Sequence, residues 1–126
     1  MPQTPYEDAR SSPTGRERRR HPRLAIDVPI TLTLAEGNFE GRLRDVSEAG
    51  VCFFLDRRIN EMTVLSMRLR LPDSPPVDAA GVVVRCDALS KHVDHYEVAV
   101  FLNQVDPENK AKLLAFLEAN AEDAEA

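Results

Sequence analysis

The fold is decided by the stretch Leu24-Ala25-Ile26-Asp27-Val28-Pro29-Ile30-Thr31-Leu32-Thr33-Leu34. Its apolar residues occupy every second position, which places them on one face of a β-strand while the polar residues take the other. Pro29 falls on the outward face and has no N–H to donate to a ladder. We therefore expect a half-buried strand that lies at a sheet edge or is bulged at Pro29.

The same alternation continues along the chain. Glu36-Gly37-Asn38 predicts a turn into a second strand through Phe39 to Leu43, and the polar residues 45 to 50 predict a short loop after it. Further strands are expected at Val51 to Leu55, Leu65 to Leu71, Val82 to Cys86 and Tyr96 to Leu102. About six strands with short connections predict an all-β-dominated, antiparallel barrel or sandwich.

One helix is expected, at the C-terminal end of this series. Asp106 is a good N-cap, Pro107 suits the first helical position, and the chain from 107 to 119 carries an apolar stripe. The members of that stripe are Leu113, Leu114, Phe116 and Leu117. We expect this helix to pack on the barrel.

Length and charge predict one domain with two dissimilar ends. The chain has 126 residues and a net charge of −5, and that size suits a single core. We expect a flexible basic arm at 1–17, a folded domain at 18–118 and an acidic tail at 119–126. No apolar run is long enough to cross a bilayer and the N-terminus lacks the apolar stretch of a signal peptide, so a cytoplasmic location without membrane contact is expected.

Two polar segments are candidates for binding. The first is Arg16-Glu17-Arg18-Arg19-Arg20-His21-Pro22-Arg23, where planar guanidinium groups can bond phosphate oxygens in pairs and stack on a purine. A solvated tail or a nucleic-acid patch is the plainer interpretation of such a run. The second is Asp45-Val46-Ser47-Glu48-Ala49-Gly50, in which a carboxylate can accept from a guanine edge and a hydroxyl can donate to a phosphate. The same residue types also serve an ordinary turn.

Together the two segments resemble the PilZ family, whose signature is R-x-x-x-R followed by D/N-x-S-x-x-G. The resemblance covers about residues 17 to 118 and implies a PilZ-type β-barrel of about six strands with one C-terminal α-helix. It also implies a receptor for the second messenger cyclic di-GMP (c-di-GMP). On this resemblance, Arg19 and Arg23 hold phosphates and stack on guanine, Asp45 reads a guanine edge, and Ser47 and Gly50 line the pocket.

Three further positions take their meaning from the same resemblance. Arg18 precedes the first motif, and in the family an arginine there tends to accompany two mutually intercalated ligands per chain. Arg85 stands where the family often places an additional binding side chain, although an exposed strand arginine is the commoner explanation. Ala99 departs from the glycine that many relatives have in the final strand, which affects packing more than the ligand site.

The function expected from these observations is that of a cyclic di-GMP receptor or adaptor that changes conformation on binding and signals to a downstream protein. One alternative is a PilZ-fold adaptor that acts without ligand. Another is a nucleic-acid-binding module using the arginine arm, which the negative overall charge opposes.

Catalysis, a cofactor and a bound metal are not expected. The histidines His21, His92 and His95 have no recognisable partner motif for a nucleophile, and a triad assembled from Asp45, Ser47 and a remote histidine would lack a nucleophile elbow. The histidines and cysteines also lack metal-ligand spacing. Cys52 and Cys86 are expected as reduced thiols rather than a disulfide.

Overall fold

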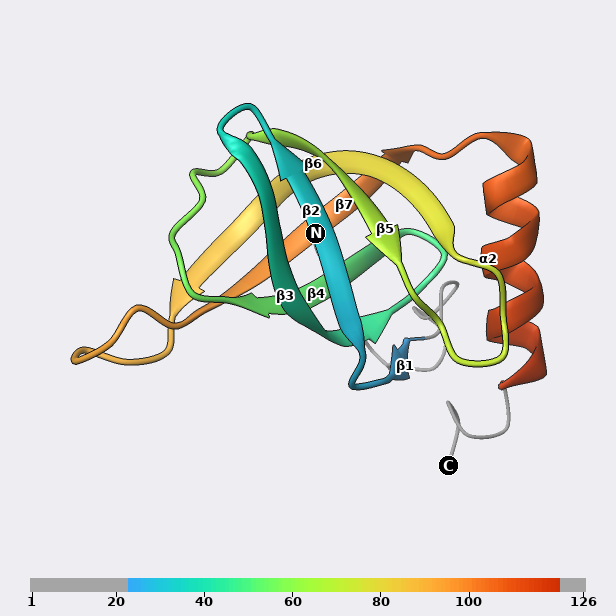
Figure 1. Cartoon of the computed structure of the whole chain (residues 1–126), viewed down its shortest axis with the longest axis horizontal. Helices are drawn as coiled ribbons and strands as arrows, with labels where there is room; N and C mark the ends of the chain where they lie inside the picture. Colours follow the sequence, from blue (N-terminus) through green and yellow to red (C-terminus); the bar gives the residue numbers. More distant parts are fainter. Residues whose placement is uncertain (1–22, 121–126) are drawn as a thin grey trace, which may run out of the picture.

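The computed structural model describes residues 23–120. This part of the chain forms seven strands followed by one helix (Figure 1). The strands are β1 Leu24–Ala25, β2 Pro29–Leu34, β3 Gly37–Val46, β4 Gly50–Leu55, β5 Val64–Leu69, β6 Val77–Ala88 and β7 Tyr96–Gln104, and the helix is α2 Pro107–Ala119. The expected arm and most of the expected acidic tail lie outside the described residues.

Six of the strands close into an antiparallel barrel. Their order is β3-β2-β5-β6-β7-β4, and the additional pairing of β4 with β3 closes the ring. The two-residue strand β1 lies outside this ring and pairs with the end of β3. The prediction of a barrel of about six strands with one C-terminal helix is confirmed.

The first predicted strand is divided in two. β1 and β2 both pair with β3, but residues 26–28 between them leave the regular ladder, although Ile26 N still donates to Arg44 O at 3.0 Å. Pro29 begins β2, and the pairing of β2 with β5 begins one residue later, at Ile30. The missing N–H of Pro29 therefore falls at a strand start and not at a sheet edge, because β2 lies between β3 and β5.

Two predicted connections have different bounds in the structure. The hairpin turn consists of residues 35–36, since Leu34 pairs directly with Gly37, instead of residues 36–38. The loop expected at 45–50 is also shorter: Asp45 belongs to β3 and Gly50 to β4, so only residues 47–49 connect the two strands. Polar residues at an outward position of a ladder look like loop residues in a sequence, and that explains the error.

The barrel interior is filled by the alternating apolar residues. Leu32, Phe53, Leu69, Val83 and Val98 come from five different strands and are almost completely buried. β6 is longer than expected and its pairing with β7 shifts register between Ala80 and Gly81 and again between Val83 and Arg85. The second shift is a bulge at Val84, and it turns Arg85 to the outer face of the barrel.

The helix α2 stands at one end of the barrel, beside the chain that leads into β6 (Figure 1). Asp106 caps it by accepting from Asn109 N at 2.8 Å, and Asn109 Oδ1 accepts from Asp78 N at 2.8 Å, which fixes the helix to the start of β6. Leu113 and Phe116 are buried, whereas Leu114 is exposed and so lies outside the contact face.

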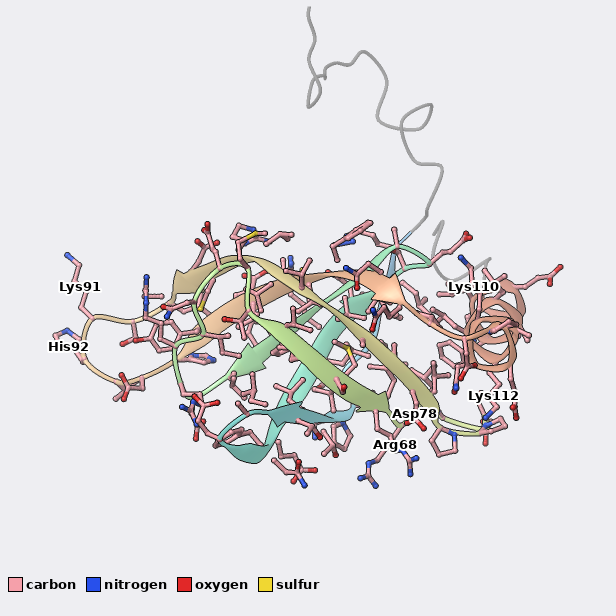
Figure 2. All side chains as sticks on the ribbon, turned by 90° about the horizontal axis from the view of Figure 1, so that it is seen from above. Arg68, Asp78, Lys91, His92, Lys110 and Lys112 are labelled. Atoms are coloured by element: carbon pink, nitrogen blue, oxygen red, sulfur yellow. The ribbon has the colours of Figure 1, made fainter. Side chains whose placement is uncertain are left out.

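Figure 2 shows Lys110 and Lys112 on this helix and Lys91 and His92 on the loop at the opposite end. Among residues 23–120 no helix is long and apolar enough to cross a membrane.

Candidate ligand-binding site

A continuous row of side chains crosses the outer face of the barrel. The strand registers place Asp45 of β3 opposite Cys52 of β4, Cys52 opposite Ala99 of β7, and Ala99 opposite Arg85 of β6. Ala25 of β1 extends the row beyond Asp45. Cross-strand partners are about 5 Å apart, so four barrel strands bring the carboxylate of Asp45 and the guanidinium of Arg85 to the same outer face. Between them lie two small residues, Cys52 and Ala99, which we call the floor of the site.

Two arginines from distant parts of the chain contact the same floor residue, Cys52. Arg23 Nη2 lies 3.7 Å from Cys52 Sγ, and Arg85 Nη2 lies 3.9 Å from the same sulfur. Cys52 is only 1% exposed although it faces outward, so these side chains and their neighbours cover it. The floor is therefore flanked by positive charge on both sides.

Asp45 lies at the β3 end of the floor between two arginines. Its Oδ1 is 3.5 Å from Arg23 Nε, and its Oδ2 is 3.4 Å from Arg44 Nη1. Oδ1 is buried and has no hydrogen-bond partner within the described residues, since the contact with Arg23 lacks hydrogen-bond geometry. A buried carboxylate oxygen in this condition is destabilising unless another donor reaches it.

Two more ion pairs complete the charge pattern. Arg44 Nη1 donates to Glu97 Oε2 at 2.8 Å, crossing from β3 over β4 to β7. Arg85 donates to Asp87 on its own strand, and this hydrogen bond raises the pKa of the Arg85 guanidinium above its ordinary value. The arrangement offers three guanidinium groups around a floor of small side chains, which suits a planar ligand that carries negative charge.

The turn beside this floor is held by one serine. Ser47 Oγ accepts from the N–H groups of Ala49 and Gly50, both at 3.2 Å, and lies 3.3 Å from Gly50 O, to which it can donate. Ser47 is 2% exposed. A Cβ on Gly50 would lie 2.7 Å from Val100 O, so glycine is required there for β4 to approach β7 closely.

A family model described as PilZ domain matches residues 17–119. The chain belongs to the PilZ domain family. No curated protein matches the sequence.

Solved structures share the fold of this PilZ domain at low sequence identity. The inhibitor of motility MotI/DgrA of Bacillus subtilis has a TM-score of 0.70 at 15% identity, with 83% of this chain covering 51% of that one. The PilZ domain of Escherichia coli YcgR, solved with c-di-GMP, has a TM-score of 0.65 at 14% identity, with 86% and 99% covered. The MrkH–c-di-GMP complex of K. pneumonia has a TM-score of 0.69 at 16% identity, with 86% and 53% covered.

The chain thus spans about half of MotI and of MrkH.

The structure places the predicted site residues in two groups. Arg23 and Asp45 of the signature, together with the additional candidate Arg85, lie along the outer row. Ser47 and Gly50 lie in the adjoining turn, buried, with the hydroxyl engaged by the turn itself. Arg18 and Arg19 lie outside the described residues, so their roles stay predictions.

Three residues of this face were not singled out from the sequence. Cys52 reaches it through the pairing of β4 with β3, and Glu97 through the pairing of β7 with β4, and no local pattern reveals either pairing. Arg44 reaches it because the β3–β4 register shifts between Leu43 and Asp45. The one available signal was Arg44's position directly before the aspartate of the second motif.

Proposed function

We propose that this PilZ domain is a cyclic di-GMP receptor that signals by binding. The single observation that carries the proposal is the state of Asp45: it has a buried oxygen without a hydrogen-bond partner among residues 23–120, and it adjoins a floor of small side chains flanked by arginines. A guanine edge presents two neighbouring N–H donors, which is what a carboxylate of this kind requires. The solved complexes of YcgR and MrkH with c-di-GMP give the same fold a precedent for this ligand.

The arginines would take the phosphates and stack on the bases. Arg23 is about half exposed and Arg85 similarly so, which leaves both free to turn toward a ligand. The small side chains of Cys52 and Ala99 would let a purine lie close to the strands. Binding would draw the arginines away from their carboxylates, and this rearrangement is the conformational change that we propose a downstream partner reads.

Calorimetric titration with cyclic di-GMP tests the site, using Asp45→Ala and a matched control. Asp27→Ala is that control, because Asp27 also pairs with an arginine of β3, Arg42 at 2.8 Å, but is absent from the row. Loss of the charge-assisted bonds to a guanine is worth roughly 1.5–3 kcal/mol, so the affinity of Asp45→Ala should fall about tenfold or more. Wild-type affinity in Asp45→Ala would refute the guanine-reading role.

GTP and a DNA oligonucleotide in the same titration distinguish the other function classes. A nucleic-acid module would bind the oligonucleotide with a steep dependence on salt and little response to Asp45→Ala. An adaptor that acts without ligand would bind none of the three. Catalysis is disfavoured because the Ser47 hydroxyl, the nucleophile that a hydrolase would need, is buried in its turn.

A further inference from the structure

Three arginines of the site each pair with a carboxylate, and two of these pairs, Arg44 with Glu97 and Arg85 with Asp87, lie outside the family signature. We propose that Arg44 is a further ligand-contact residue, and that Glu97 holds Arg44 until a ligand phosphate displaces it. This inference rests on the proposed function and deepens it, because it makes Glu97 a residue that determines the affinity for the nucleotide.

The geometry places the Arg44 guanidinium on the ligand face. Arg44 occupies the position at which the β3–β4 register shifts, next to Asp45. Its Nη1 lies 2.8 Å from Glu97 Oε2 and 3.4 Å from Asp45 Oδ2, so the group spans β4 at the edge of the floor. Arg44 is half exposed whereas Glu97 is 17% exposed, which makes the arginine the partner that can move.

Glu97 has a second carboxylate for a neighbour. The β6–β7 register pairs it directly with Asp87, and like charges at such a position are destabilising. Arg44 on Glu97 and Arg85 on Asp87 offset this repulsion in the structure. When ligand phosphates take both arginines, the two carboxylates face each other without their partners. The repulsion between Glu97 and Asp87 therefore lowers the affinity for the ligand, and a neutral residue at position 97 should raise it.

Glu97→Gln tests the holding role. It keeps the size of the side chain, releases Arg44 and removes the repulsion, and we expect affinity for cyclic di-GMP to rise roughly two- to fivefold, as the strength of a surface ion pair implies. Arg44→Gln should lower affinity roughly tenfold or more, because a charge-assisted phosphate contact is lost.

Asp78→Asn is the matched control for charge. Asp78 pairs with Arg68 through two hydrogen bonds, of 2.7 and 2.9 Å, and Figure 2 shows the two side chains together. It also lies on β6, seven residues before Arg85, roughly 20 Å along the strand. This variant removes the same charge and frees an arginine, yet its affinity for cyclic di-GMP should equal that of wild type.

The double variant Arg44→Gln/Glu97→Gln separates holding from simple repulsion. If Glu97 acts through Arg44, most of the gain of Glu97→Gln disappears in the Arg44→Gln background. An equal gain in both backgrounds would overturn the holding role, and unchanged affinity in Arg44→Gln would overturn the contact. A rise in Asp78→Asn equal to that in Glu97→Gln would reduce the effect to net charge and overturn the inference. No binding by wild type would instead overturn the proposed function, and this inference with it.

Discussion

Replacing Ser47 with alanine should mainly lower the stability of the fold, and not the affinity for the ligand. Ser47 is 2% exposed and its hydroxyl accepts from two backbone N–H groups, so its loss leaves two donors without partners, that of Gly50 buried and that of Ala49 partly buried. Each such donor costs roughly 1–3 kcal/mol, and allowance for the partly buried Ala49 N–H gives a total of roughly 2–4 kcal/mol. For a domain of about 100 residues, this corresponds to a fall of roughly 8 °C or more in Tm.

Ser90 offers a matched control. Its hydroxyl accepts from the N–H groups two and three residues ahead, His92 at 3.0 Å and Val93 at 3.3 Å, which is the pattern of Ser47 in an exposed loop. Water replaces the lost acceptor there, so the free energy of unfolding of Ser90→Ala should stay within about 0.5 kcal/mol of that of wild type. Circular dichroism melts of both variants give the comparison. If Ser47→Ala melts like Ser90→Ala but binds cyclic di-GMP weakly, the hydroxyl serves the ligand and the stability argument fails.

Three other expectations concern single positions. Gly50→Ala should lower the free energy of unfolding by roughly 1–3 kcal/mol and so shift the urea midpoint down, because its Cβ would lie 2.7 Å from Val100 O. An unchanged midpoint would contradict this. Hydrogen bonds from Asn109 lower the pKa of Asp106, so its contribution to stability is present above the ordinary value of 3.8 and is lost as pH falls through the lowered one. Acid unfolding of Asp106→Asn should accordingly begin from a lower Tm at neutral pH and show a smaller further loss. Arg18→Leu should reduce the expected two ligands per chain toward one in a titration at known active concentration, and one equivalent bound by wild type would refute that stoichiometry.

Features with a local cause could be predicted from the sequence. The helix bounds 107–119 agree with the structure because its signals, Asp106 at the cap and Pro107 at the first position, act within a few residues. Strand alternation predicted the barrel because each inward residue needs the same buried face. Leu114 was an error of detail: an apolar residue on a short helix can point away from the contact face, and only the position of the barrel decides which side is buried.

Features with a long-range cause could not be predicted. Whether Asp45 ends a strand or begins a loop depends on Ala25 and Cys52, which pair with it from opposite sides. The contact of Arg44 with Glu97 joins residues 53 positions apart and needs both a register shift and a third strand between them. The motif residues Arg23 and Asp45 were found without geometry, by family resemblance, and the structure then brought them within 3.5 Å.

The shortest strand of the described fold adjoins one of the principal proposed phosphate contacts. Asp45 is fixed on both sides by neighbouring strands, whereas Arg23 precedes a strand of two residues that pairs only with the end of β3. A ligand held by Arg23 and Asp45 together would join this weakly paired segment to the closed barrel, and local stability there should rise with occupancy. The barrel would thus provide the proposed guanine-reading floor, and the segment at β1 would be the element whose stability a bound nucleotide changes. We propose that this division allows the barrel to report its ligand to a partner.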